Sequence, residues 1–324
     1  MTTATISVIV PFYNEADNLP TFHDRLSRVI ESLTKRYPYT WEIVYVDDGS
    51  NDNALDWLQR QQKKDRRITL VQLSRNFGKE AALSAGADLC QGDAAIFIDA
   101  DLQDPPELIP QLIEPWHNKQ ADIVYARRLS RKGESWLKKV SAALFYKVLG
   151  RLTHITIPPN TGDFRLMSRE TLDQLNKLRE HHRFMKGLFA WVGYRQKEVL
   201  YHREARHLGR SKWNYRALWR LSLEGITSFS TMPLTLATYL GLIAVIGALI
   251  YAALIIYQTL MYGTDVPGYP SLMVTILFMG GAQMLTIGIL GAYIGRIFNE
   301  VKQRPLYLVK THQRATQKMT KKKP

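Results

Sequence analysis

The stretch AAIFIDADLQDPPE, residues 94–107, decides the fold class, because an apolar strand runs directly into a pair of carboxylates. Residues 94–98 predict a buried strand, and Asp99 and Asp101 follow at its carboxyl end. Two carboxylates separated by one residue can reach one hard divalent cation, and such a cation bridges the phosphates of a nucleotide. We therefore expect Asp99 and Asp101 to hold Mg²⁺ or Mn²⁺, with Gln103 or Asp104 joining the ligands or orienting them, although an isolated Asp-x-Asp pair is also typical of a solvated turn.

Three further strands are predicted before this stretch, separated from one another by helical patterns. The strands are expected at 6–10, 43–46 and 68–73, and the helices at 18–36, 52–64 and 79–90. This alternation predicts an α/β domain with a parallel sheet and helices on both faces. Ligands bind beyond the carboxyl ends of the strands in such sheets, where Glu15 and Asp48 also lie. The segment Asp48-Gly49-Ser50 is equally typical of a plain turn.

The charge balance restricts the partners. The 324 residues carry 43 Lys and Arg against 29 Asp and Glu, and the net charge of +14 indicates nucleic acid, anionic lipid or a phosphorylated substrate. Much of this charge lies in the carboxyl-terminal tail and beside the apolar segments, which favours lipid phosphate and no nucleic acid. The single cysteine, Cys90, excludes intramolecular disulfides and cysteine-rich zinc sites. Dinucleotide-binding and P-loop glycine motifs are missing from the sequence.

Two segments without Asp, Glu, Lys or Arg, 225–264 and 266–295, exceed the ~20 residues that a helix needs to cross a bilayer. We expect membrane spans near 233–258 and 271–294. Their connection has no Lys or Arg while both outer flanks are basic, so the positive-inside rule predicts a cytoplasmic catalytic domain and two cytoplasmic termini. The first residues have no basic segment before their apolar run and predict a strand rather than a signal peptide.

Two basic amphipathic stretches, 134–152 and 213–232, combine aromatic and aliphatic residues at helical spacing with Lys and Arg. Helices of this kind are typical of the membrane interface, although a pair of ordinary surface helices would show the same pattern. The predicted organisation is a catalytic domain at 1–212, a juxtamembrane helix at 213–232, a transmembrane hairpin at 233–295 and a basic cytoplasmic tail at 296–324.

Six motifs occur in order along the chain. They are VIVPFYNE (8–15), VDDGS (46–50), LSRNFGKEAALSAG (73–86), IDADLQDPPE (98–107), TGDFRLM (161–167) and GRSKWNY (209–215). In this order and together with two spans, they resemble glycosyltransferase family 2 over about residues 5–310. The resemblance is to its polyprenyl-phosphate glycosyltransferases, which include GtrB-type bactoprenol glucosyltransferases, ArnC-type aminoarabinose transferases and dolichol-phosphate mannose synthases.

The resemblance implies a GT-A (Rossmann-like) fold, a nucleotide-sugar donor, a divalent metal and inversion at the anomeric carbon. By resemblance, the motif that contains Pro11, Tyr13 and Glu15 contacts the nucleoside together with Asp48. By the same resemblance, Asp99, Asp101 and Gln103 bind the metal and the pyrophosphate.

The same resemblance places Asp163 near the reacting sugar carbon as a candidate base. A lipid phosphate has a second pKa of about 6 and is already largely ionised, so an anionic acceptor needs little deprotonation. Asp163 could instead position the sugar or orient Arg165.

A phosphate acceptor also requires cations. The candidates that would hold the acceptor phosphate or the donor pyrophosphate are Arg127 and Arg128 after a fifth strand, Arg206 and Lys212. Alternatives are a solvated strand end for the first two and simple attraction to lipid headgroups for the others. Arg75 and Lys79 are expected to shape the donor pocket, although their loop is equally typical of a helix start.

These expectations combine into one predicted reaction, the transfer of a single hexose from a nucleotide sugar to undecaprenyl phosphate at the bacterial inner membrane. Glucose from UDP-glucose is the favoured donor, with mannose from GDP-mannose, aminoarabinose or an N-acetylhexosamine as alternatives. A catalytically silent, membrane-tethered scaffold is the alternative from another class. The resemblance further implies a homo-oligomer (a tetramer), a flippase and a periplasmic glycosyltransferase downstream, and a role in O-antigen or other cell-envelope glycan modification.

Overall fold

The computed structural model describes residues 4–129, 158, 160–181, 183–202, 232–263 and 268–315. The chain divides into two compact units. The first contains Met1–Ser222 together with Pro305–Pro324, and the second is Leu223–Arg304. Of the interfacial helices predicted at 134–152 and 213–232, every residue except Met232 lies outside the described residues.

The first unit is built on an eight-stranded sheet with the order β7-β5-β6-β4-β1-β2-β3-β8. The strands are β1 (Thr5–Phe12), β2 (Thr40–Asp47), β3 (Ile68–Leu73), β4 (Ala94–Phe97), β5 (Ile123–Arg128), β6 (Thr161–Ser168), β7 (Gln196–Tyr201) and β8 (Val309–Gln313). The four strands predicted in the first hundred residues are confirmed, and they pair in parallel. The sheet as a whole is mixed, because β6 runs antiparallel to β4 and β5, and β8 runs antiparallel to β3.

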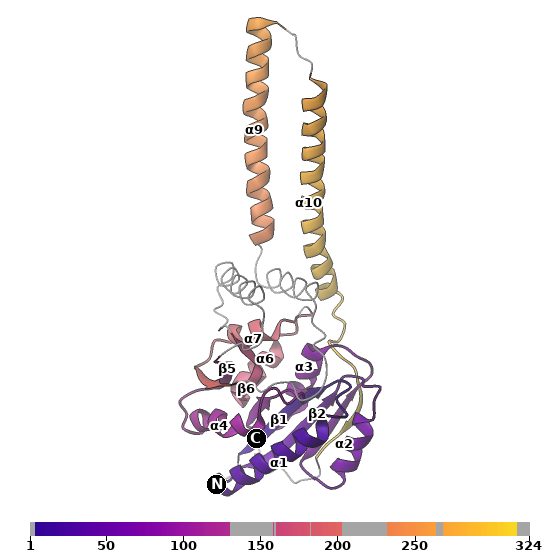
Figure 1. The fold of residues 1–324 in the computed structure, drawn as a ribbon, viewed down its shortest axis with the longest axis vertical. Helices are drawn as coiled ribbons and strands as arrows, with labels where there is room; N and C mark the ends of the chain where they lie inside the picture. The colour runs from indigo at the N-terminus through magenta and orange to yellow at the C-terminus, as the bar shows by residue number, and fades with distance from the viewer. Residues whose placement is uncertain are drawn as a thin grey trace. The chain divides into compact units, whose positions relative to one another are not determined.

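Helices cover both faces of this sheet, as predicted (Figure 1). They are α1 (Leu19–Arg36), α2 (Ala54–Gln62), α3 (Lys79–Leu89), α4 (Ile109–His117), α6 (Arg169–Lys177) and α7 (Met185–Trp191), with a 3₁₀ turn η1 (Pro106–Leu108) before α4. In α1 the apolar side chains recur every three or four residues and are buried, so this helix presents one continuous apolar face to the sheet.

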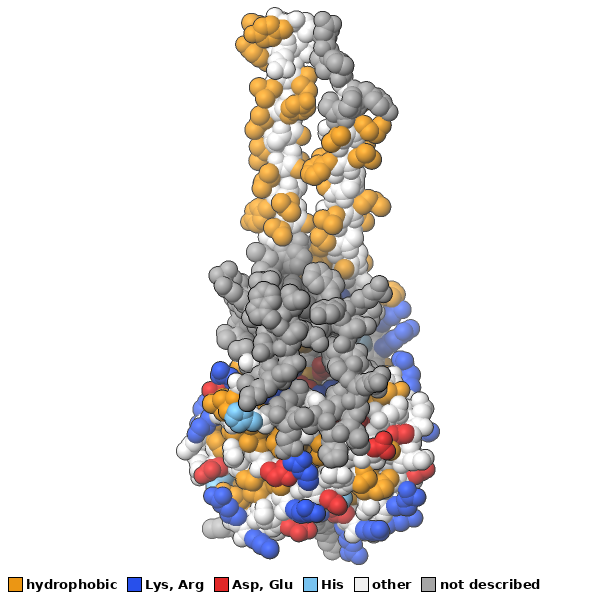
Figure 2. All heavy atoms as spheres, in the orientation of Figure 1, with side chains coloured by type: hydrophobic (Ala, Val, Ile, Leu, Met, Phe, Trp, Pro, Cys, Tyr) orange, Lys and Arg blue, Asp and Glu red, His pale blue; other side chains and the backbone are white. Residues whose placement is uncertain are grey.

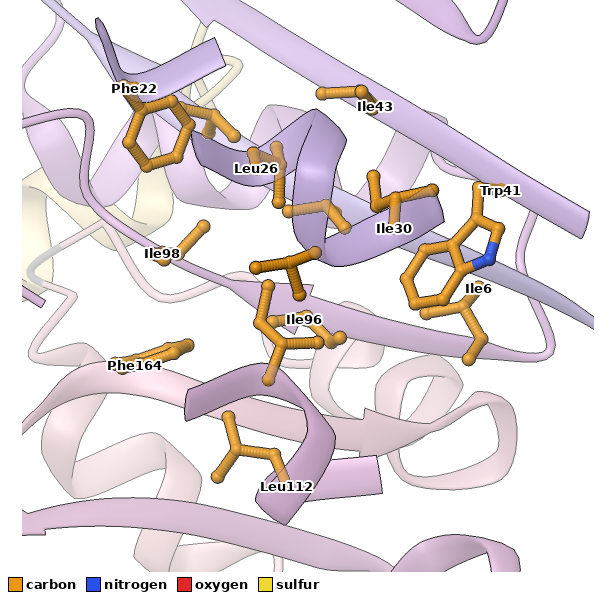
Figure 3. Close-up of a cluster of buried hydrophobic side chains, with 14 of the residues drawn as sticks. Ile6, Phe22, Leu26, Ile30, Trp41, Ile43, Ile96, Ile98, Leu112 and Phe164 are labelled. Atoms are coloured by element: carbon orange, nitrogen blue, oxygen red, sulfur yellow. The ribbon is translucent and has the colours of Figure 1, made fainter. Parts of the chain in front are cut away.

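The main hydrophobic core lies between the sheet and α1, α2 and α4. Figure 3 shows Phe22, Leu26 and Ile30 of α1 directed toward side chains of the sheet, and Ile96 lies between them and Leu112 of α4. On the opposite face α3 approaches β1 so closely that a Cβ at Gly86 would lie 2.3 Å from Cγ2 of Ile9. This close approach fixes α3, which begins at the predicted ligand edge.

The described residues of the second unit form two long helices, α9 (Met232–Tyr262) and α10 (Tyr269–Val301). Their apolar segments, Leu234–Tyr262 and Leu272–Val301, are long enough to cross a membrane. Hydrophobic side chains cover both helices in Figure 2. Both helices run a few residues beyond the predicted spans.

The chain after α10 adds the edge strand β8 to the sheet. The sequence of 296–324 predicts a basic tail and no strand. β8 contains Lys310 and His312 and is largely exposed, so its residues lack the apolar alternation that marks a half-buried strand.

Candidate active site

Three charged side chains from distant parts of the chain meet at the carboxyl edge of β4. Nζ of Lys79, the first residue of α3, donates to Oδ2 of Asp99 at 2.7 Å and to Oδ2 of Asp163 at 2.5 Å. The sheet register explains the meeting. Phe97 of β4 lies opposite Arg165 of the antiparallel strand β6, so two residues further on Asp99 comes opposite Asp163.

These charges strongly perturb one another. Burial acts to lower the pKa of Lys79, but the carboxylates of Asp163 and Asp99 outweigh it and hold that pKa above its ordinary value. For Asp163, burial acts to raise the pKa, but the ammonium groups of Lys79 and Lys186 hold it below its ordinary range. Burial raises the pKa of Asp99 to about 6, against the opposing effect of Lys79. At neutral pH the cluster therefore holds an ammonium bonded to two carboxylates.

Helix α7 closes one side of this cluster. The guanidinium of Arg165 is buried and lies over the ring of Phe189 of α7, 3.7 Å from its centroid. Glu80 of α3 accepts a hydrogen bond from the backbone of Met185 at the start of α7, and burial raises the pKa of Glu80 to about 7. The sequence analysis missed Glu80 and Lys186. Glu80 directly follows Lys79 in a quoted motif, but nothing in its spacing indicates that it would meet α7.

The turn after β4 carries the proposed metal ligands. Leu102 has φ of 60°, a left-handed conformation that is strained for a leucine and typical of functional sites, while its side chain is buried. The backbone N–H of Gln103 donates to Oδ1 of Asp101 at 3.1 Å. This hydrogen bond closes the turn that directly follows Asp99.

The fit of this site to a metal follows from its donor set. Within the described residues, no three His, Cys, Asp or Glu side chains are arranged to hold a metal ion. Mg²⁺, however, is commonly bound through one or two carboxylates together with substrate phosphates. The Asp99 and Asp101 carboxylates match that chemistry, so they fit a metal that arrives with a diphosphate.

Asp48 holds the loop that leads into α3. Its Oδ1 accepts the backbone N–H of Phe77 at 2.7 Å and its Oδ2 accepts that of Gly78 at 2.9 Å. Burial raises the pKa of Asp48, and these two hydrogen bonds oppose the rise. Gly49 has φ of 73°, and a Cβ there would lie 2.6 Å from the backbone carbon of Arg75. The turn after β2 thus holds the 75–78 loop in place by hydrogen bonds and close packing.

The turn after β1 is tied to the same region. The backbone N–H of Asn14 donates to Oγ of Ser50 at 3.0 Å, and Asn51 N–H donates to Oδ1 of Asn14 at 2.8 Å. Oε2 of Glu15 accepts a hydrogen bond from Asn18 at 2.5 Å. The structure therefore brings Glu15 and Asp48 to one edge of the sheet. Pro11 lies within β1, opposite Val46 of β2, and Tyr13 directly follows that strand.

Arg127 and Arg128 have different partners. They are the last two residues of β5 rather than residues after it, and adjacent strand residues point to opposite faces. Arg127 forms an exposed ion pair with Glu198 at 2.7 Å. Arg128 lies beside the buried Asp104 and donates from Nε to the hydroxyl of Tyr201 at 3.1 Å.

The structure describes one of the three remaining predicted cations. The guanidinium of Arg75 lies over the ring of Phe77, 4.5 Å from its centroid, at the surface of the loop. Arg206 and Lys212 lie outside the described residues, so their roles stay predictions.

Comparisons with known proteins agree with this geometry. Residues 7–175 match the model of the Glycosyl transferase family 2. The chain is 54% identical to an uncharacterized glycosyltransferase of Synechocystis, with 95% of each chain covered. It is 46% identical to the SfII prophage-derived bactoprenol glucosyl transferase of Shigella flexneri and 45% identical to a prophage bactoprenol glucosyl transferase homolog of Escherichia coli. These matches cover 95% and 94% of this chain and 98% of each relative.

A solved structure of glucosyl-3-phosphoglycerate synthase from Mycobacterium tuberculosis is 20% identical, with a TM-score of 0.47 over 69% of this chain and 77% of that one. The family match and the relatives confirm the predicted family, and the mixed sheet with helices on both faces confirms the GT-A fold. This chain belongs to glycosyltransferase family 2 and is a glycosyltransferase with two helices long enough to span a membrane.

Proposed function

We propose that this protein transfers one hexose, glucose from UDP-glucose, to undecaprenyl phosphate at the cytoplasmic face of a bacterial membrane. The observation that carries the proposal is the cluster of Asp99, Lys79 and Asp163 at the ligand edge of a sheet whose chain also bears two membrane-length helices. The relatives named as bactoprenol glucosyl transferases, matched over nearly the whole chain, support the lipid acceptor and the glucosyl group.

Donor binding follows from the charges at the strand ends. We assign the metal to Asp99 and Asp101 with Gln103 in support, and a bound metal would neutralise charge on the departing nucleoside diphosphate. Nζ of Lys79 has three N–H groups, of which the two carboxylates take two, so a third is left to donate to a phosphate oxygen of the donor. Glu15 and Asp48, at the ends of β1 and β2, flank the nucleoside, with Pro11, Tyr13 and Arg75 around it.

The transfer forms a bond from an acceptor phosphate oxygen to the anomeric carbon and breaks the bond from that carbon to the diphosphate, which departs with the electron pair. Attack from the face opposite the departing group inverts the configuration. No proton has to be removed, since the acceptor phosphate is already an anion at neutral pH. The neighbouring ammonium groups of Lys79 and Lys186 make Asp163 a weak base. We therefore propose that Asp163 fixes Lys79 and binds the sugar instead of removing a proton.

The acceptor phosphate needs cations on the other side of the sugar. We propose Arg206 and Lys212 for this role, with Arg128 in support. Arg128 is held by Asp104 and Tyr201 on the same side of β5, whereas Arg127 is engaged by Glu198 on the other side. A planar guanidinium with a fixed orientation suits a phosphate.

The product would be a polyprenyl-phosphate sugar on the cytoplasmic side. With two spans in a chain, transport across the bilayer would require a separate flippase, followed by a periplasmic glycosyltransferase. We also propose that the chain works as a homo-oligomer with both termini in the cytoplasm, in line with the basic flanks of the two spans.

The test is sugar transfer to undecaprenyl phosphate by the full chain in detergent, with a panel of radiolabelled UDP- and GDP-sugars, with and without EDTA. We expect transfer from UDP-glucose that EDTA abolishes. Asp101→Asn is expected to lower transfer by about 10²-fold or more and to weaken Mn²⁺ binding, because it removes one anionic ligand. Asp56→Asn, an exposed position on α2, is the matched control.

Transfer from a different nucleotide sugar would change the proposed donor and leave the proposed reaction unchanged. Full activity in Asp101→Asn would overturn the metal assignment. A folded protein that transfers no sugar would instead favour the silent scaffold.

A further inference from the structure

The segment that follows α10 is part of the catalytic unit. We call Pro305–Gln313 the strap. It begins after residues 302–304, which are all that separate it from the last residue of α10. Its strand β8 pairs with β3, with Gln72 opposite Thr311 and Leu73 opposite Val309. The carbonyl oxygen of Leu308 then accepts the backbone N–H of Ser74 at 2.9 Å. The strap therefore holds the chain at the residue where β3 ends.

The strap also holds the helix that follows. The hydroxyl of Tyr307 donates to Oδ2 of Asp88 at 2.6 Å, in the last turn of α3. Both terminal nitrogens of Arg179 donate to the same carboxylate, at 2.7 and 2.9 Å. Tyr307 thus belongs to a partly buried network that fixes the end of α3. Its neighbour Leu308 binds the chain just after β3, so these two adjacent residues hold the chain before the 75–78 loop and at the end of α3.

The loop between these two attachments carries the donor-binding lysine. Asp48 holds the loop at Phe77 and Gly78, and Lys79 comes next. An α-helix moves as a rigid rod, so a shift of α3 at Asp88 displaces Lys79 at its other end. The hydrogen bonds of Lys79 to its two carboxylates are 2.7 and 2.5 Å long, and displacements of about 1 Å are enough to impair a site of this kind.

We propose that the strap is a positioning element for the donor site and that Tyr307 is its positioning residue, acting through Asp88 and α3 on Lys79. This proposal extends the proposed function, and its KM and kcat measurements depend on that function. Residues that follow the second membrane-length helix in the sequence therefore complete the donor site. A catalytic unit that lacks the strap loses one of the attachments that hold the end of α3.

Tyr307→Phe in the full chain removes the hydroxyl and keeps the ring. We expect the KM for the nucleotide sugar to rise about tenfold while kcat changes less than about twofold, which corresponds to the loss of one hydrogen bond to a charged acceptor. Amide hydrogen exchange in residues 74–82 should become about tenfold faster. Tyr194→Phe is the matched control, because it removes a hydroxyl bonded to the carboxylate of Glu170 outside the strap. It should leave both quantities unchanged.

A disulfide separates the effect of the Tyr307 hydroxyl from that of the β3–β8 pair. Gln72 and Thr311 are opposite each other across the β3–β8 pair, and their side chains are 3.3 Å apart. Directly opposed residues of an antiparallel pair lie within the Cα separation that a disulfide spans. In Gln72→Cys/Thr311→Cys the oxidised form should keep the wild-type donor KM and exchange rates. In Tyr307→Phe/Gln72→Cys/Thr311→Cys the oxidised form should keep the raised KM and the faster exchange, because the disulfide holds β8 on β3 but does not replace the hydroxyl that binds Asp88.

Two results would overturn the proposal. One is unchanged amide exchange in residues 74–82 of Tyr307→Phe. The other is a donor KM that the oxidised disulfide restores in the absence of the Tyr307 hydroxyl. Hydrogen exchange needs no substrate, so it decides the role of the strap even if the wild-type protein transfers no sugar, a result that would count against the proposed function alone.

Discussion

Asp48→Asn tests whether the turn after β2 holds the donor loop. The two carboxylate oxygens of Asp48 accept the backbone N–H groups of Phe77 and Gly78 at 2.7 and 2.9 Å, and the residue is 3% exposed. An asparagine has the same shape, but one of its two terminal atoms is a donor. Whichever way the amide turns, one backbone N–H faces an NH₂ group and the other loses a charged acceptor.

The expected loss of stability follows from these two effects. A hydrogen bond to a charged acceptor contributes about 1.5–3 kcal/mol, and a buried donor without a partner costs about 1–3 kcal/mol. Movement of the loop recovers part of this, so we expect a net loss of about 2–4 kcal/mol. For a unit of this size, that loss lowers the melting temperature by about 5–10 °C.

Thermal unfolding of the detergent-solubilised protein, followed by tryptophan fluorescence, measures this effect. Asp52→Asn is the control, because Asp52 also accepts two backbone N–H groups, from Ala16 and Ala54, but is less buried. It should lower the melting temperature by less than about 2 °C. A melting temperature for Asp48→Asn within that same range would refute the role of Asp48 as the anchor of the loop.

Three further predictions concern other parts of the catalytic unit. Lys79→Met should lower kcat/KM for the nucleotide sugar by about 10²-fold or more, because it removes the ammonium between two carboxylates that binds the donor; a kcat/KM within tenfold of wild type would contradict this. Gly86→Ala should lower stability by about 1–2 kcal/mol in thermal unfolding, because its Cβ would lie 2.3 Å from a β1 side chain, whereas unchanged stability would show that α3 can move away. Burial lowers the pKa of His23, so the unfolded chain binds a proton that the folded one does not as pH falls below 6.5. Stability should therefore decrease below pH 6.5 by at most about 1.4 kcal/mol per pH unit from this group, and more shallowly in His23→Gln.

The sequence could predict the first four strands and the strand-end carboxylates. Residues 94–98 are apolar and are followed at once by Asp99, so a single short segment contains both the strand and its functional end. Local patterns of this kind need no knowledge of distant contacts. The two long helices were predictable for the same reason, because their composition identifies them without reference to neighbours.

The rest depends on contacts between distant segments. The antiparallel strand β6 lies between β4 and β5 in the sheet, and the pattern of its own residues does not indicate that place. The ion pair of Lys79 with Asp163 joins residues 84 positions apart and follows from that strand order. Likewise, β8 is an exposed edge strand with charged residues, so only its partner β3 distinguishes it from a basic tail.

The most direct test of the account is transfer of radiolabelled glucose from UDP-glucose to undecaprenyl phosphate by the purified full chain, with extraction of the lipid product and identification of its anomeric configuration. We expect a glucosyl lipid of inverted configuration, formed with Mg²⁺ or Mn²⁺ and lost with EDTA. A product of retained configuration, or equal transfer with EDTA, would contradict the mechanism proposed for Asp99, Asp101 and Lys79.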